Sequence, residues 1–249
     1  MKKIFKDWTF RIALLFVLAS ALSYTVHYFI FHDVHHIFLY MIGDFGFLFI
    51  DVLLVLLIIE RLLAGREKKS ILQKLNMVIG TFFSEVGMEL LRRFSDFVEN
   101  SEQLESEFLI NPHWDKKYFR EAQSKAASFK YSIVINAEGL EELRDFLKGK
   151  HSFLVRLLEN PILLENQRFT DLLWAVFHLS EELNFRESLR DLPTGDIAHL
   201  KTDLQRTYSK IISEWIAYTE HLKDRYPFLF SLAARINPLN PKASPVVQE

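Results

Sequence analysis

Two long apolar runs near the N-terminus constrain this chain more than any other feature of its sequence. They cover residues 9–31 and 37–59, about 23 residues each. At a rise of about 1.5 Å per residue, either run can cross a hydrocarbon core about 30 Å thick as a helix. Residues 32–36 between them suffice only for a tight turn. We therefore expect residues 1–64 to form a two-helix transmembrane hairpin in the lipid bilayer.

A cleaved signal peptide is the alternative interpretation of the first run. A basic segment precedes the run, and Ala19-Ser20-Ala21 has the small-residue pattern of a cleavage site. The apolar run nevertheless continues for ten residues beyond that pattern, to Phe31, which is too long for a signal peptide. We favour an uncleaved helix, and the second run would stop translocation in either case.

Basic residues flank the predicted hairpin on one side only. They precede the first run and follow the second, whereas the turn has no Lys or Arg; in order, they are Lys2, Lys3, Lys6, Arg11, Arg61, Arg66, Lys68 and Lys69. The positive-inside rule then predicts an integral membrane protein with both termini cytoplasmic and the turn outside. We expect the second group, Arg61 to Lys69, to contact anionic lipid headgroups.

The remainder of the chain has the pattern of amphipathic helices. Apolar residues recur every three or four positions beyond Gly65, and the clearest series runs from Ile197 to Leu222 at nearly heptad spacing. Glycine (8) and proline (7) are scarce, which favours helix over turn-rich architectures. We predict an all-α fold, with a cytoplasmic bundle of about five helices over residues 65–236 and a flexible tail over 237–249.

Local signals predict where these helices begin. Asn111 followed by Pro112 resembles an N-cap with proline at the first helical position, and Thr194 is a plausible cap for the last long helix. Asn160 and the proline after it close the preceding segment. The second apolar run is expected to continue into the domain as a rod that is broken near Gly65.

Two carboxylates lie inside the second apolar run. Asp44 and Asp51 are seven residues apart, so a helix places them on one face. Each costs about 2.5–3.5 kcal/mol on insertion scales, so such residues usually face partners or water. One interpretation is an ion or proton path through several associated hairpins. The other is satisfaction within the hairpin, with Arg11 paired to Asp51 and with Asp44 bonded to Ser23, Tyr24 or His27.

Histidine is concentrated in the outer turn. His27, His32, His35 and His36 put four imidazoles close to Asp33, and imidazole with carboxylate suits divalent transition metals. Two of the imidazoles are adjacent in sequence, however, no His-x-His pair occurs, and no His-x-x-x-His pair lies within an expected helix. Three interpretations remain open: a metal site formed by His32, Asp33, His35 and His36, a pH response, or plain residence at the membrane interface.

The predicted domain carries weaker signals. The pairs that share a helix face are Glu85 with Glu89 and His178 with Glu181. A carboxylate di-iron bundle needs two Glu-x-x-His helices, and the nearest match is the single pair of Asp196 and His199. We interpret all of these as solvated charged faces. Three histidines are expected to stand alone on the surface or at helix ends: His151, His199 and His221.

Composition and missing motifs exclude several classes of function. The 30 basic and 32 acidic residues give a net charge of −2, which provides no basis for nucleic-acid binding. The absence of cysteine excludes thiol catalysis and thiolate metal sites. No phosphate-binding loop, nucleophile elbow or zinc-protease motif occurs. We therefore expect no catalytic residues and no enzyme.

Three hypotheses about function follow. The first is a membrane-anchored, non-enzymatic interaction or signalling module that self-associates and engages a cytoplasmic protein. The second is a homo-oligomeric ion channel or transport component in which Asp44 and Asp51 line the path. The third is a metal-dependent membrane sensor that uses the histidine-rich outer turn.

Overall fold

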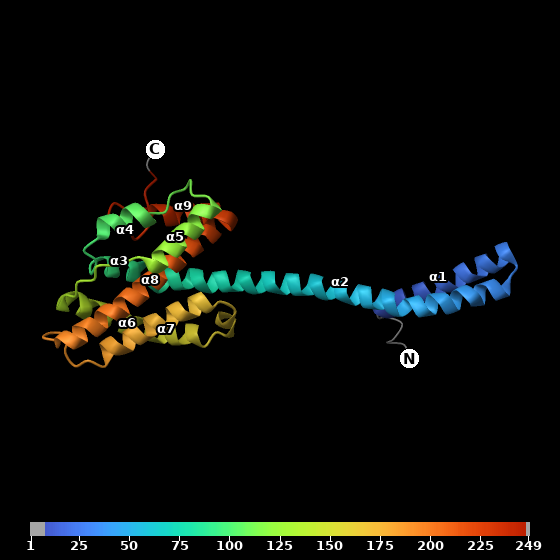
Figure 1. Cartoon of the computed structure of the whole chain (residues 1–249), viewed down its shortest axis with the longest axis horizontal. Coiled ribbons are helices and arrows are strands. Elements are labelled where there is room, and N and C mark those ends of the chain that lie inside the picture. The colour runs from blue at the N-terminus through green and yellow to red at the C-terminus, as the bar shows by residue number, and fades with distance from the viewer. Residues whose placement is uncertain (1–7, 248–249) are drawn as a thin grey trace. The chain divides into compact units, whose positions relative to one another are not determined.

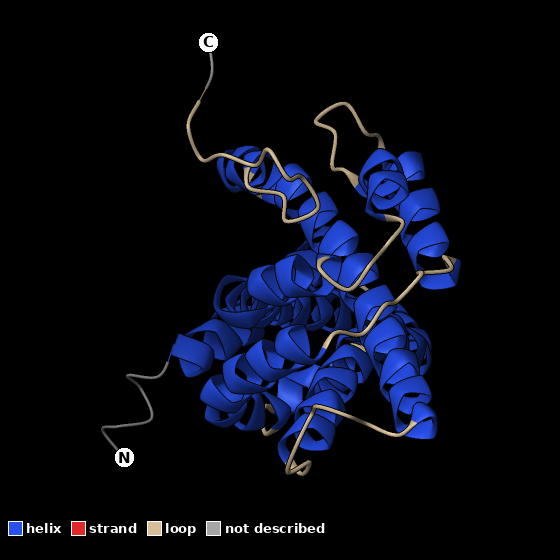
Figure 2. Ribbon diagram, turned by 90° about the vertical axis from the view of Figure 1, so that its left-hand side faces the viewer, coloured by secondary structure: helices blue, strands red, loops and turns tan. Residues whose placement is uncertain are grey.

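The computed structural model describes residues 8–247, so Lys2, Lys3 and Lys6 lie outside the described residues. Within this range the fold is all-helical, as predicted (Figure 1). Figure 2 draws helices and loops, and no strand, for the described residues. Among these residues one isolated β-bridge occurs, between Val98 and Ile133. The chain divides into two compact units, Met1–Glu67 and Lys68–Glu249.

The first unit contains α1 (Trp8–Phe31) and the first part of α2 (Val34–Phe82). Between them the chain reverses at His32, whose φ of 52° lies in the left-handed region. The side chain of Asp33 then accepts a hydrogen bond from the backbone N–H of His36 at 3.2 Å, which caps the start of α2. Both helices are long and apolar enough to cross a membrane, by length and composition.

The predicted break near Gly65 is wrong, because α2 continues through this residue without interruption. The neighbouring residues are strong helix formers, including Leu62, Leu63 and Ala64, and a single glycine costs a helix only about 1 kcal/mol. The helix geometry changes later, at a π-helical turn over Phe83–Gly87.

The second unit is built from the end of α2 and a series of further helices. After the π-helical turn these are α3 (Met88–Ser95), α4 (Ser101–Phe108), α5 (Lys116–Ser128), α6 (Ala137–Leu158), a 3₁₀ turn (Pro161–Glu165), α7 (Gln167–Asn184), α8 (Thr194–Arg225) and α9 (Pro227–Arg235). The helix α8 is central, because α3, α5, α7 and α9 all pack against it.

Short polar side chains determine where several of these helices begin. Asn160 caps the 3₁₀ turn through its contact with the N–H of Ile162. The cap predicted at Asn111 is wrong, because its side chain accepts from His113 in a preceding turn and Asp115 caps α5 instead. Thr194 is the first residue of α8 and makes no capping hydrogen bond.

The core of the second unit consists of the apolar positions that recur along each helix. Tyr208 and Trp215 of α8 are buried, and so are Phe82 and Phe83 at the end of α2. The rings of Phe82 and Phe169 meet edge-on, with their centroids 5.4 Å apart. The helix α7 also packs directly against α8, which positions the side chains on their shared edge.

The packed part of this unit extends beyond the boundary predicted at residue 236. Asn237 is buried and its side chain accepts a hydrogen bond from the N–H of Leu239, which is also buried. Farther along, the N–H of Ser244 donates to the carbonyl of Arg235 at 3.1 Å. The segment after α9 therefore folds back onto the helix.

A candidate metal centre between two helices

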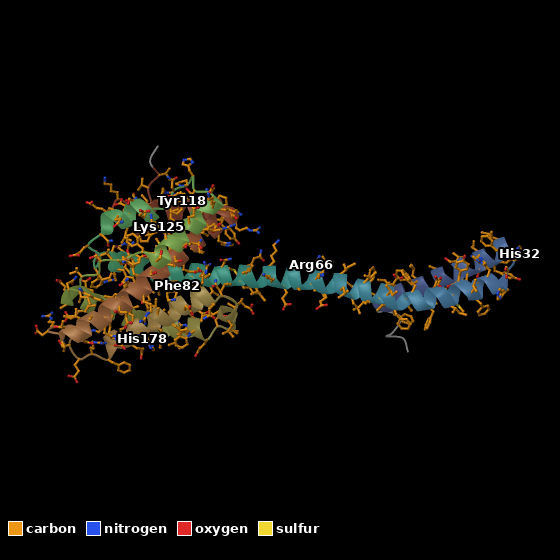
Figure 3. All side chains as sticks on the ribbon, in the orientation of Figure 1. His32, Arg66, Phe82, Tyr118, Lys125 and His178 are labelled. Carbon is orange, nitrogen blue, oxygen red and sulfur yellow. The ribbon has the colours of Figure 1, made fainter. Side chains whose placement is uncertain are left out.

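Four potential metal ligands converge between α7 and α8. His178 and Glu182 are four residues apart on α7, and His199 and Asp203 have the same spacing on α8. Residues at this spacing lie one above the other on a helix face. Because the two faces meet, one ligand atom from each side chain lies within 4.8 Å of every other. Figure 3 labels His178 within this unit.

The distances between these atoms suit a small ion. The Nε2 atoms of His178 and His199 each lie 3.3 Å from Oδ2 of Asp203. The carboxylate of Glu182 lies 3.5 Å from His199 Nε2 and 3.8 Å from His178 Nε2. A tetrahedral zinc ion with bonds of about 2.0–2.1 Å would separate its ligand atoms by about 3.3 Å. The side chains are therefore close to the positions that such an ion requires.

Asp203 is the most unusual member of the cluster. Its side chain is only 2% exposed, and neither of its carboxylate oxygens has a hydrogen-bond partner among the described residues. Arg206 Nη1 lies 3.1 Å from Oδ1 as an ion pair without hydrogen-bond alignment. A buried carboxylate is costly unless it is paired or coordinates a metal. Its second oxygen, Oδ2, faces the two imidazoles.

Glu182 is held in place by an arginine outside the cluster. Arg186 Nη1 donates to Glu182 Oε2 at 2.7 Å, and the other face of the guanidinium binds Asp196 through two hydrogen bonds of 2.9 and 2.6 Å. The hydrogen bonds from Arg186 hold the pKa of both carboxyl groups below their ordinary values. Partners of this kind orient metal ligands in many sites. Glu182 keeps its other oxygen, Oε1, on the side of His178.

The donor set defines the chemistry of the site. Two imidazole nitrogens and two carboxylate oxygens suit divalent zinc, iron, cobalt or manganese. Four protein ligands fill a tetrahedral coordination sphere, whereas catalytic zinc sites usually keep one position for water or substrate. The arrangement is thus suited to holding an ion between two helices.

Comparisons with known proteins place the chain in a family. One family model, the C-terminal helical domain of MJ1433, matches residues 71–235, and a second, the N-terminal helical domain of MJ1433, matches residues 2–63. The uncharacterized protein MJ1433 of Methanocaldococcus jannaschii is 42% identical over 238 residues, which cover 96% of each chain. The chain belongs to the MJ1433 family. No solved structure matches it.

In this member of the MJ1433 family, the outer turn brings together a different set from the one predicted. His27 Nε2 lies 3.3 Å from His36 Nδ1, and the two rings stack with centroids 5.5 Å apart. Asp33 acts as the helix cap described above, and the ring of His32 lies beside Tyr28. His35 is exposed. The pair that forms therefore joins α1 to α2.

The other predicted membrane residues lie on the two long helices. Asp44 and Asp51 are on α2, and Arg11 is on α1. Their role in an ion path, or in pairing with each other, stays a prediction. The basic residues expected at lipid headgroups are all exposed on α2: Arg61, Arg66, Lys68 and Lys69.

Several residues of the domain that we expected to be solvated or to stand alone have partners instead. His199 belongs to the metal cluster, and His178 pairs with Glu182 rather than with Glu181. Glu181 instead faces His151 of α6 at 3.4 Å. A search for two histidines on one helix misses the centre because each helix contributes one histidine, and a search for Glu-x-x-His misses it because each histidine lies four residues before its carboxylate. The available signal was the spacing His-x-x-x-Glu followed by His-x-x-x-Asp on consecutive helices.

Proposed function

We propose that this protein is a membrane-anchored, non-enzymatic interaction module whose helical domain is controlled by a divalent transition metal. The observation that carries the proposal is the buried carboxylate of Asp203, which has no hydrogen-bond partner among the described residues and faces two imidazoles at 3.3 Å. A bound ion would satisfy that carboxylate and link α7 to α8.

Reversible binding is favoured over a permanent structural role. His178 and His199 are 45% and 49% exposed, so an ion can reach the centre directly from solvent. Arg186 and Arg206 already supply positive charge to the two carboxylates. Binding of an ion therefore releases less free energy than it would at carboxylates without a cationic partner. Metal occupancy can therefore follow the local metal concentration and adjust the stability of the domain.

The membrane anchor rests on length, composition and charge. Two helices have the length and hydropathy of membrane spans, and the basic residues lie on one side of the hairpin. We place both termini in the cytoplasm, where the domain would meet a protein partner, and we retain self-association of the hairpins as part of the proposal. The intramembrane carboxylates Asp44 and Asp51 provide polar contacts for that association.

Zinc titration of the full chain tests the metal function. Isothermal titration calorimetry of metal-stripped protein in detergent should show saturable Zn²⁺ binding, with one ion held by the cluster between α7 and α8. His199→Ala should weaken this binding at least about tenfold, because one of four ligands is lost. His151→Ala is the matched control, since this histidine faces Glu181 and lies outside the cluster. Equal affinity in all three proteins would overturn the proposal.

Cysteine labelling tests the topology. The chain has no cysteine, so a single introduced thiol can be followed without background. A membrane-impermeant maleimide should label Asp33→Cys in intact cells and should label Ser244→Cys only after the membrane is opened. Labelling of Ser244→Cys in intact cells would contradict the proposed orientation.

The outer turn is a second candidate metal site. The close approach of His27 and His36 favours it, because two imidazoles from different helices already lie 3.3 Å apart. This would be a sensor site outside the membrane, as the third hypothesis states. Replacing both histidines with alanine should remove one of two zinc-binding events if this site operates, and should leave the titration unchanged if it does not.

A further inference from the structure

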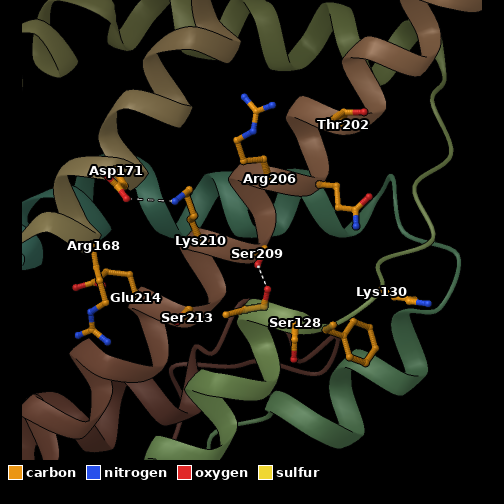
Figure 4. A pocket seen from close by; sticks show the side chains of 13 residues that line it. Ser128, Lys130, Arg168, Asp171, Thr202, Arg206, Ser209, Lys210, Ser213 and Glu214 are labelled. Atoms are coloured by element: carbon orange, nitrogen blue, oxygen red, sulfur yellow. Dashed lines mark hydrogen bonds and ion pairs between the residues drawn. The ribbon is translucent and has the colours of Figure 1, made fainter.

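A cleft of about 590 Å³ lies between α5, α7 and α8, beside the candidate metal centre (Figure 4). Ligand pockets commonly have volumes of about 300–1,000 Å³, so the cleft has room for a small organic molecule. Its lining contains four cationic side chains and two carboxyl groups, which gives it an excess of positive charge. None of the sequence patterns indicated this site.

The positive charge lies at the rim of the cleft. Lys130, Arg168 and Arg206 are exposed, and Lys210 is 35% exposed. Lys210 Nζ forms an ion pair with Asp171 Oδ2 at 3.6 Å, which a dashed line in Figure 4 marks. Within residues 8–247, no carboxylate forms an ion pair with Lys130 or Arg168. Lys130 and Arg168 can therefore bind an anion without first breaking an ion pair.

Side-chain oxygens on the inner surface of the cleft can accept hydrogen bonds from a ligand. Ser209 and Ser213 are half-buried, and their hydroxyls donate to the carbonyls of Ala126 at 3.1 Å and Gln123 at 3.4 Å. Their protons are thus committed to the backbone, while their oxygen lone pairs remain available. Glu214 adds a buried carboxyl group, and burial raises the pKa of that group. A ligand must therefore bring donors to the interior and negative charge to the rim.

We propose that this cleft binds a small phosphorylated polyol, with its phosphate at the basic rim and its hydroxyls against Ser209, Ser213 and Glu214. A phosphate takes charge-assisted hydrogen bonds from Arg168 and Lys130. Polyol hydroxyls donate to the serine oxygens and to the oxygens of the Glu214 carboxyl group. The same chemistry occurs in soluble sugar or glycerol phosphates and in lipid headgroups, so the test distinguishes these two sources.

Calorimetry with glycerol 3-phosphate tests the proposal on the full chain in detergent. A chelator is present throughout, so the result does not depend on the metal centre. We expect saturable binding of glycerol 3-phosphate, with inorganic phosphate and glycerol each at least about tenfold weaker, because each keeps only part of the contacts. Absence of saturable binding, or equal affinity for inorganic phosphate, would overturn the proposal.

Three variants locate the binding. Arg168→Gln should weaken both phosphate compounds, and Ser213→Ala should weaken glycerol 3-phosphate alone. Arg156→Gln is the matched control, because it removes the same charge from an exposed position of α6 that does not line the cleft. An equal loss in the control would assign the effect to overall charge and would overturn the proposal.

Nanodiscs of two compositions identify the source of the ligand. The affinity for free glycerol 3-phosphate is measured in phosphatidylcholine discs and in discs containing phosphatidylglycerol. Weaker apparent binding in the second would show competition by the lipid headgroup and assign the cleft to lipid. Unchanged binding would support a soluble metabolite.

Discussion

Replacing one metal ligand should abolish the stabilisation of the domain by zinc. Glu182→Gln is the chosen change, because it keeps the shape of the side chain and removes the charge that an ion needs. The side chain is 26% exposed and faces both His178 and His199. Its loss should leave the rest of the packing between α7 and α8 intact.

The magnitude follows from linkage and from the size of the domain. At a zinc concentration about 100 times the Kd, binding to the folded state alone adds about 2.7 kcal/mol. The unit Lys68–Glu249 has about 180 residues, a size at which 1 kcal/mol moves Tm by about 2–4 °C. Zinc should therefore raise the Tm of the wild type by about 5–11 °C.

The metal-free variant has a smaller defect of its own. Glu182→Gln breaks the ion pair with Arg186, in which the two side chains are 26% and 17% exposed. A partly solvated pair contributes on the order of 1 kcal/mol, so the Tm without zinc should fall by about 2–4 °C. Arg186 retains its two hydrogen bonds to Asp196. The loss of response to zinc is thus separable from the loss of stability.

Thermal unfolding is followed by tryptophan fluorescence, for which the buried Trp215 is a suitable reporter. The control is Glu181→Gln, one residue away, because Glu181 faces His151 outside the cluster. It should keep the full zinc response. A zinc-dependent rise in the Tm of Glu182→Gln equal to that of the wild type would show that Glu182 is not a zinc ligand, and so would loss of the rise in the control alone.

Three further predictions concern the core, the buried acid and the link between the two sites. Phe82 is fully buried, so Phe82→Ala should lower the free energy of unfolding in urea by about 3–5 kcal/mol, and a loss below about 1 kcal/mol would contradict its place in the core. Burial raises the pKa of Glu214, so the stability it contributes is complete below the unfolded pKa and is lost as pH rises through the folded value. The stability of the wild type relative to Glu214→Gln should therefore fall as pH rises above about 4, the ordinary pKa range of a glutamate, and a difference that is constant with pH would count against this. Zinc bound to Asp203 should also tighten glycerol 3-phosphate binding, because it would release Arg206 from its ion pair with Asp203 at 3.1 Å. Identical affinity for glycerol 3-phosphate with and without zinc would exclude this coupling between the two sites.

The sequence was sufficient to predict the helical fold because its signals are local and repeated. The series from Ile197 to Leu222 predicts the inward face of α8, and its central members Tyr208 and Trp215 are buried. Asn160 caps the turn that follows α6 as its position before proline suggests. Each of these signals depends on residues within one or two helical turns of each other.

The errors arose where two local signals compete or where a signal is too weak to act. Asn111 and Asp115 can both begin a helix, and the choice between them depends on how the segment packs. Gly65 is a weak helix breaker, and the strong helix formers around it prevail. Neither outcome follows from the residue type alone.

The candidate metal centre could not be predicted with the same tools because its four side chains come from separate helices. His178 and Asp203 are 25 positions apart in the chain, yet their ligand atoms lie 3.3 Å apart. The burial of Asp203 depends on the packing of α7 against α8, which the helical pattern does not specify in detail. The basic cleft has the same origin, since α5, α7 and the middle of α8 each supply part of its lining.

A crystal structure of the zinc-soaked full chain, with an anomalous difference map at the zinc edge, tests the proposed metal centre directly. We predict a peak between α7 and α8, about 2.0–2.2 Å from His178, Glu182, His199 and Asp203. A peak confined to other residues, or no peak between these helices at saturating zinc, would contradict it.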